Sequence, residues 1–189
     1  MPTRARERLL EAAEELFYAE GIRAVGVESI LAASGVGRAS FYRHFASKDD
    51  LVVAVLRSRD ERWRQWLADS VAARDVAPEE RPLVVFDALA ERLARADFRG
   101  CAFINTMVEA ADPESAAHRT AADHKRAVIA YLDELLADAG VTDHAAVAAE
   151  QLLLMDGAIV TALREGSPEP AQRAKRIFAA LLASPEPAN

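Results

Sequence analysis

The stretch "SGVGRASFYRHFASKDDL", residues 34–51, carries the side chains best suited to do chemistry. After a Gly-x-Gly turn it presents guanidinium, hydroxyl, phenol and imidazole groups within one short segment, and a lysine follows. Such groups donate hydrogen bonds to phosphate oxygens and to the edges of bases. The residues expected to contact DNA are Arg38, Ser40, Tyr42, Arg43, His44 and Lys48.

The elements that must position these side chains are two short helices, expected over residues 27–34 and 38–44 with a turn at Gly35. This arrangement is typical of a helix-turn-helix motif. Phe41 and Phe45 lie one helical turn apart and would face inward, which leaves the polar residues between them outside. The residues expected to pack against a preceding helix are Ile30, Leu31, Val36, Phe41 and Phe45.

A phosphate-binding loop is the alternative interpretation of Gly35-x-Gly37. A nucleotide-binding loop needs Gly-Lys-Ser/Thr after its glycines and a strand before it. The sequence has neither feature, so this alternative is rejected.

Helical spacing of apolar residues recurs along the chain, and no segment alternates like a strand. The expected fold class is therefore all-α, with about nine helices. The first covers about residues 4–19 with Thr3 as its cap, and Ser47 with Asp50 forms a variant capping box. Further helices are expected over about 47–74, 79–96, 101–111, 113–139, 144–165 and 170–183. Asp112 and Asp143 are expected to cap two of them, and the tail after residue 183 is expected to be frayed.

Composition favours a folded globular protein, with 51% hydrophobic and 28% charged residues among 189. The longest aliphatic runs are far shorter than the about 20 residues of a membrane span, and the N-terminus lacks the apolar core of a signal peptide. The single cysteine, Cys101, suits a reducing compartment and is interpreted as a small buried hydrophobe. A cytoplasmic protein without membrane contact is expected.

Charge is distributed unevenly, although the net charge is −7. Residues 1–48 hold seven Lys or Arg against six Asp or Glu, and residues 35–48 hold three Lys or Arg, one His and no acid. This local basic patch could contact a few phosphates, but it could not coat DNA indiscriminately.

The segment from Gly21 to Leu51 resembles the DNA-binding region of the TetR family of transcriptional repressors. The matching residues are Ile30, Gly35, Val36, Arg38, Ala39, Ser40, Phe41, Tyr42, His44, Phe45, Ser47, Lys48, Asp49 and Leu51. Val25, Gly26 and Gly37 stand where the family often has hydroxyl residues, so no phosphate contact is assigned to their side chains.

The resemblance implies a helix-turn-helix DNA-binding domain over residues 1–47 and a ligand-binding and dimerisation domain over 48–189. It also implies a homodimer that binds a palindromic double-stranded DNA operator, with recognition helices about 34 Å or somewhat more apart. A small-molecule effector would release this repressor from its operator.

The later helices supply candidates for the effector pocket and the dimer interface. The pocket candidates are Trp66, Phe86, Phe103, Asn105, Met107, Glu109 and Tyr131, for each of which core packing is the alternative. Wide apolar faces on the last two helices indicate a dimer interface, with a monomer core as the alternative. The dimer candidates are Leu152, Met155, Ile159, Leu163, Ile177, Phe178 and Leu181.

No pattern of His, Cys, Ser or acidic residues predicts an enzyme, a metal site or a cofactor. His118, His124 and His144 share no helical face and are interpreted as isolated surface residues. Two alternatives stay open. One is a helical small-molecule-binding or catalytic protein whose N-terminal helices are scaffold only, and the other is a DNA-binding activator or a repressor without an effector.

Overall fold

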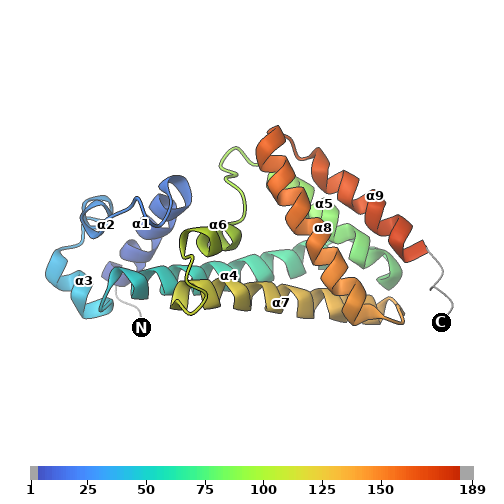
Figure 1. The fold of residues 1–189 in the computed structure, drawn as a ribbon, viewed down its shortest axis with the longest axis horizontal. Coiled ribbons are helices and arrows are strands. Elements are labelled where there is room, and N and C mark those ends of the chain that lie inside the picture. Colours follow the sequence, from blue (N-terminus) through green and yellow to red (C-terminus); the bar gives the residue numbers. More distant parts are fainter. Residues whose placement is uncertain (1–3, 184–189) are drawn as a thin grey trace. The chain divides into compact units, whose positions relative to one another are not determined.

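The computed structural model describes residues 4–183, and all regular structure in this range is helical (Figure 1). It comprises nine α-helices and one short 3-10 helix, so the all-α prediction is confirmed for these residues. The expected Thr3 cap and the tail after residue 183 lie outside the described range. The chain forms two compact units, Met1–Arg62 with Ala102–His124 and Trp63–Cys101 with Lys125–Asn189.

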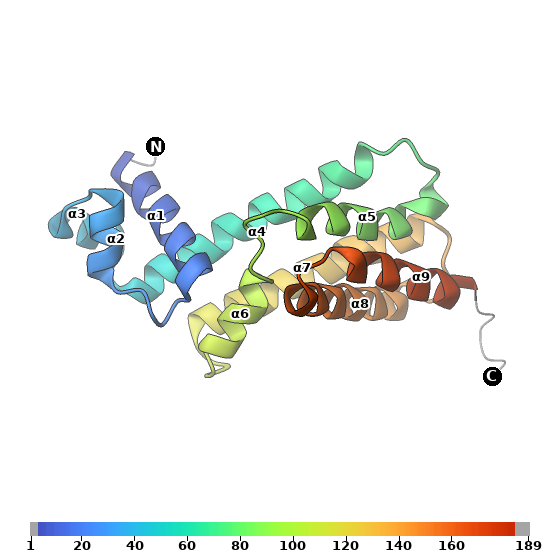
Figure 2. The same ribbon diagram turned by 90° about the horizontal axis from the view of Figure 1, so that it is seen from above.

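The first unit is built on the N-terminal helices, α6 (Ala102–Glu109) and the first part of α7 (Ala116–Asp138). Its N-terminal helices are α1 (Arg4–Glu20), α2 (Val27–Ser34), α3 (Arg38–His44) and the first part of α4 (Lys48–Ala72). Leu9, Ala13 and Phe17 recur every four residues along α1 and are buried, as the helical period requires. In both Figure 1 and Figure 2, α3 lies on the far side of α1 from α6.

The second unit holds most of the apolar core. Its remaining helices are the 3-10 helix (Pro78–Glu80), α5 (Arg81–Leu93), α8 (His144–Glu165) and α9 (Glu169–Ala183). α8 and α9 lie side by side (Figure 2). The rings of Phe86 and Phe178 are both fully buried, with centroids 5.6 Å apart, and they join α5 to α9. Gln151 Nε2 donates to the Pro82 carbonyl at 2.8 Å and joins α8 to α5.

Two helix starts and one cap differ from the sequence prediction. The helix expected from Pro113 begins at Ala116, because Ser115 N–H donates to the Asp112 carbonyl in a turn and Ser115 Oγ then accepts the His118 N–H at 3.2 Å. The helix expected from residue 79 opens as the 3-10 helix. Asp143 precedes α8, but its side chain makes no capping hydrogen bond.

α8 is the one helix in the described range that is long and apolar enough to cross a membrane, with a mean hydropathy of 1.5 over 18 residues. One of its faces packs into the core of the second unit, through Leu152, Met155 and Ile159. A core helix meets the same criteria of length and composition, and this burial accounts for the apolar residues on that face.

The compact units do not end where the sequence suggested a domain boundary. α6 and the first part of α4 belong with the N-terminal helices, whereas the expected boundary follows residue 47. The expected boundary separates a DNA-binding part from a ligand-binding part, and it stays a prediction.

Candidate nucleic-acid interface

The turn between α2 and α3 depends on Gly35. Its backbone is left-handed, with φ of 61°, a conformation that favours glycine. The Arg8 guanidinium donates to the Ser34 carbonyl from Nε at 2.8 Å, and a Cβ on Gly35 would lie 2.6 Å from Arg8 Nη2. The backbone conformation therefore favours glycine here, whereas the end of the flexible Arg8 side chain could shift away from a Cβ. Arg8 anchors the turn to α1.

Two aromatic rings hold α3 against the rest of the first unit. Phe41 is 0% exposed and Phe45 is also buried, with the two ring centroids 6.0 Å apart. The Arg6 guanidinium lies 5.5 Å from the centre of the Phe45 ring, a favourable cation–π distance. Ile30 and Val36 are buried as well. The predicted inward orientation of both rings is confirmed.

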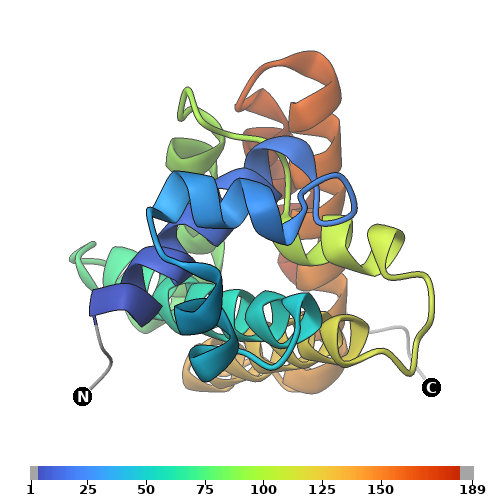
Figure 3. The same ribbon diagram turned by 90° about the vertical axis from the view of Figure 1, so that its left-hand side faces the viewer.

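The opposite face of α3 is presented to solvent (Figure 3). Tyr42 is 51% exposed, and Arg38 and Arg43 are exposed too, while Ser40 and His44 are half-buried. A short helix with one apolar edge and a basic, hydroxyl-bearing edge is suited to lie in the major groove of DNA. Contact of each of these side chains with DNA stays a prediction.

Arg38 forms an ion pair with Glu28 of α2, which the sequence analysis did not foresee. Both side chains are largely exposed, and exposed ion pairs of this kind contribute at most about 1 kcal/mol. Arg38 can therefore exchange Glu28 for a phosphate or a base edge at little cost.

Lys48, expected to hold a phosphate, has a second task in the structure. Its Nζ donates to the carbonyl oxygens of Ile22 and Val25, at 2.6 and 2.7 Å. These carbonyls belong to the loop between α1 and α2, so Lys48 fixes that loop to the start of α4. An ammonium has three donors, which leaves one for a phosphate.

Replacing Lys48 by alanine is expected to lower the free energy of unfolding by about 1–2 kcal/mol, because two loop carbonyls lose a charged donor. If Lys48 also binds a phosphate, the slope of log affinity against log salt falls by about one unit. Chemical denaturation measures the first effect, and titration of DNA at several salt concentrations measures the second. Unchanged stability would show that the Lys48 contacts do not hold the loop.

The start of α4 follows the sequence prediction. Ser47 Oγ accepts the Asp50 N–H at 3.1 Å, which confirms Ser47 as the capping side chain. Gly26 and Gly37 precede α2 and α3 with extended backbones and no side-chain cap.

Comparison with known proteins places this geometry in a family. Residues 9–55 match the model described as bacterial regulatory proteins, tetR family. A crystal structure of a TetR-family transcriptional regulator from Streptomyces coelicolor is 33% identical, with 96% of this chain and 90% of that chain covered and a TM-score of 0.87. The chain belongs to the TetR family. It is a DNA-binding transcriptional regulator of the helix-turn-helix type.

Two further proteins extend the comparison. The reduced form of NemR from Escherichia coli shares the fold, with a TM-score of 0.85 at 23% identity and with 96% of this chain and 99% of that chain covered. The HTH-type transcriptional repressor DhaR from a Mycobacterium species is 31% identical over 107 residues, which are 57% of this chain and 52% of DhaR. The chain thus spans about half the length of this curated relative.

The pocket candidates of this TetR-family chain fall into both units. Asn105, Glu109, Met107 and Phe103 belong to α6 in the first unit, and Trp66, Phe86 and Tyr131 belong to the second. Phe86 is a core residue with no exposed surface. Trp66 is half-buried beneath the Arg92 guanidinium, 4.7 Å from the ring centre. Tyr131 is half-buried, and this burial raises the pKa of its phenol.

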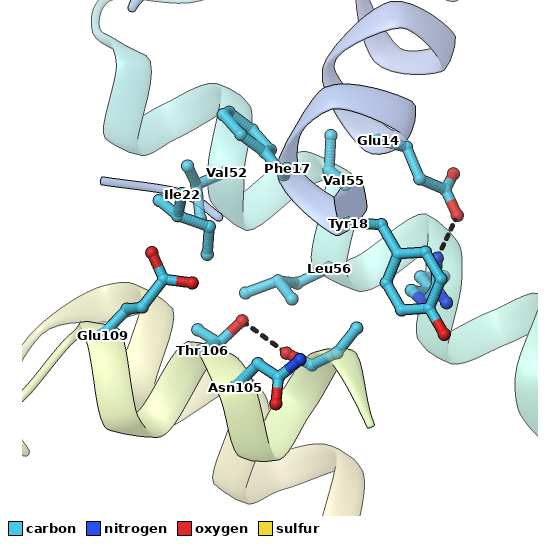
Figure 4. A pocket seen from close by; sticks show the side chains of 12 residues that line it. Glu14, Phe17, Tyr18, Ile22, Val52, Val55, Leu56, Asn105, Thr106 and Glu109 are labelled. Atoms are coloured by element: carbon cyan, nitrogen blue, oxygen red, sulfur yellow. Dashed lines mark hydrogen bonds and ion pairs between the residues drawn. The ribbon is translucent and has the colours of Figure 1, made fainter. Parts of the chain in front are cut away.

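A hollow of about 390 Å³, counting its open mouth, lies between α1, α4 and α6 of the first unit (Figure 4). Among the pocket candidates, Asn105 and Glu109 line it. Half of its wall is apolar, and sequence reasoning missed this part because most of these residues follow the ordinary helical core pattern, while Ile22 lies in the loop after α1. The apolar wall residues are Phe17, Ile22, Val52, Val55, Leu56 and Ala102.

The dimer candidates divide by burial. Leu152, Met155, Ile159 and Phe178 are buried in the core of the second unit, and their part in a dimer interface stays a prediction. Leu163 and Ile177 are exposed, and Leu181 is half-buried. Leu153 and Val160 of α8 are exposed apolar residues as well, although neither is among the dimer candidates.

The interpretation of His124 as an isolated surface histidine is wrong. It is 3% exposed, stacks on the Phe103 ring with centroids 3.5 Å apart, and places Nδ1 2.7 Å from Asp60 Oδ1. His118 Nδ1 lies 2.9 Å from the Ala110 carbonyl oxygen, and His144 Nδ1 lies 2.5 Å from Asp133 Oδ1. Residues 4–183 contain no cluster of three or more His, Cys, Asp or Glu placed to hold a metal ion.

Proposed function

We propose that this regulator is a cytoplasmic repressor that binds a palindromic operator as a homodimer and leaves it when a small molecule binds. The observation that carries the DNA-binding part is the two-sided character of α3. Phe41 anchors its inner edge, and Arg38, Tyr42 and Arg43 stand on its outer edge. The relative DhaR is a transcriptional repressor, which supports repression as the direction of control.

Selection from random duplex DNA tests this proposal. The purified protein is mixed with the pool at about 100 mM salt, and bound DNA is sequenced after several rounds. An enriched palindrome whose half-sites are about one helical turn or somewhat more apart is expected. Failure to enrich any sequence would contradict specific DNA binding, and a single half-site would contradict the dimer.

A second step addresses the direction of control. The enriched operator is placed before a reporter gene, with and without the regulator. A fall in transcription is expected when the regulator is present, because a protein seated on a promoter excludes polymerase. A rise would make the protein an activator, the alternative left open by the sequence.

The homodimer is expected to use the exposed apolar residues of α8 and α9. Leu153 is 73% exposed, Ile177 is 55% exposed, and Val160 and Leu163 are also exposed. An apolar stripe of this kind on a folded protein marks a contact surface. Gly157 lies between Leu153 and Val160 on α8 and leaves room for close approach of a second helix.

The double variant Leu153→Glu with Ile177→Glu is expected to raise the dimer dissociation constant at least about a hundredfold, since each change buries a charge in an apolar contact. Analytical ultracentrifugation measures the dissociation constant. Val108, 75% exposed on α6, offers a matched control as Val108→Glu, which is expected to leave the dimer intact. Equal dimerisation of all three proteins would place the interface elsewhere.

A further inference from the structure

The hollow of the first unit has unbalanced charges. Glu14 at one side accepts hydrogen bonds from Arg59, at 2.9 Å, and from Arg62. Arg59 also stacks over Tyr18, with its guanidinium carbon 4.3 Å from the ring centre. Figure 4 shows Glu14 and Tyr18 on one side of Leu56 and Glu109 on the other. The Glu14 side is therefore neutralised by cations of the protein itself.

Glu109 has no such cation. Within residues 4–183 its only polar partner is a neutral one, the Arg23 backbone N–H, which donates to Oε2 at 2.8 Å. The carboxylate lies against Gly21, where a Cβ would be 3.1 Å from Oε2 and 3.2 Å from Oε1. It is half-buried beside apolar wall residues. A carboxylate in such surroundings gains from a cation, because apolar neighbours weaken its solvation.

The Thr106 hydroxyl, close to Glu109 in the wall, is also an acceptor of hydrogen bonds. Thr106 is buried, and its hydroxyl donates its hydrogen to the Ala102 carbonyl, with an Oγ1–O distance of 2.7 Å. Oγ1 can therefore take part in further hydrogen bonds only as an acceptor. Asn105, one residue before it, contributes an amide to the same wall. The charged residues that remain in the lining, Glu14 and Arg59, belong to the Glu14 side, and the other wall residues are aliphatic or aromatic.

We propose that this hollow binds an organic amine with an apolar body, whose ammonium pairs with Glu109. The body fills the space between Phe17, Ile22 and Leu56, and the ammonium donates to Glu109 Oε1. The hollow is open to solvent, so a ligand with one ring and a short chain would lie partly inside it and partly at its mouth. Binding of the amine does not depend on the proposed function. Only a role of this ligand in releasing DNA rests on that function.

Binding is tested with three probes of one shape and different charge: 4-phenylbutylamine, 4-phenylbutanol and 4-phenylbutyrate. The full chain is labelled at isoleucine methyl groups and titrated in a nuclear magnetic resonance experiment. Ile22 lines the hollow, while Ile177 lies in the second unit and serves as the internal control. The amine is expected to shift the Ile22 methyl signal and to bind at least about tenfold more tightly than the alcohol, with the butyrate weakest.

Glu109→Gln separates charge from shape. Glutamine keeps an acceptor oxygen for the Arg23 N–H, so the loop is retained, but the preference for amine over alcohol is expected to fall to less than about twofold. Glu114→Gln removes an exposed carboxylate outside the hollow and is expected to keep the preference. Ala102→Leu fills the hollow and is expected to weaken all three probes.

Three results would overturn the proposal. They are an Ile22 signal that does not move at millimolar amine, equal binding of amine and butyrate, and a preference that survives in Glu109→Gln. None of these measurements uses DNA, so failure of the amine site is distinguishable from failure of operator binding, which the selection from random DNA tests separately.

Discussion

Replacing Phe41 by alanine is expected to lower the free energy of unfolding of the first unit by about 3–5 kcal/mol. Phe41 has no exposed surface, and its ring contacts both Tyr42 and Phe45, with centroid distances of 5.1 and 6.0 Å. Domains of this kind are stable by only about 5–15 kcal/mol, so the loss removes a large share of the total. Operator binding is expected to fall with it, because α3 loses its anchor.

Chemical denaturation followed by circular dichroism measures this effect. Phe41→Leu keeps most of the buried volume and is expected to cost about 1–1.5 kcal/mol, which makes it the graded control. Val108→Ala, at a largely exposed position of the same unit, is expected to change stability by less than about 0.5 kcal/mol. If Phe41→Ala unfolded at the same denaturant concentration as the unaltered protein, the anchoring role of this ring would be wrong.

Reversing the charge of Arg43 is expected to weaken operator binding at least about a hundredfold, or about 2.7 kcal/mol, while the fold is kept. Arg43 is exposed on the outer edge of α3, and the reversal places a carboxylate where a phosphate or base edge is expected. The loss combines the missing contact with repulsion by the DNA backbone. Electrophoretic shift of the selected operator at fixed salt measures the affinity.

Arg119→Glu supplies the matched control for this experiment. Arg119 is an exposed arginine in α7 of the same unit, where it pairs with the exposed Glu114. The variant has the same net charge as Arg43→Glu but leaves α3 unchanged, so its affinity is expected to stay within about threefold of the original. Equal affinities of both variants would favour the scaffold-only alternative for the N-terminal helices.

Arg38 tests base readout on the same face. Arg38→Ala is expected to relax the preference for particular bases if this side chain contacts a base edge. A uniform loss across sequences would make it a phosphate contact instead. Its ion pair with Glu28 does not obstruct either role, because both partners are largely exposed.

Much of the helix-turn-helix could be predicted because its signals are local. Gly35 and Gly37 mark the turn, and Phe41 and Phe45 fall on one edge of a helix by their spacing alone. The predicted bounds of α2 and α3 are confirmed for this reason. Asp112-Pro113 misled the prediction of α7, because the same residues that open a helix also form a turn, and here the Ser115 N–H closes that turn on Asp112.

The sequence by itself determined the helical class and the inward and outward edges of α3, since helical period and capping act over a few residues. It also determined the family, because the matching residues lie within one continuous segment. Only the tertiary structure decided how the polar groups are used. Lys48 donates hydrogen bonds to a loop more than twenty positions away in the sequence. The Glu109 carboxylate accepts a hydrogen bond from the Arg23 N–H, 86 positions away. The tertiary structure also decided that Leu152 is buried in the core while Leu153 is exposed. Such choices depend on which helices meet, and contacts between distant residues leave no mark in local spacing.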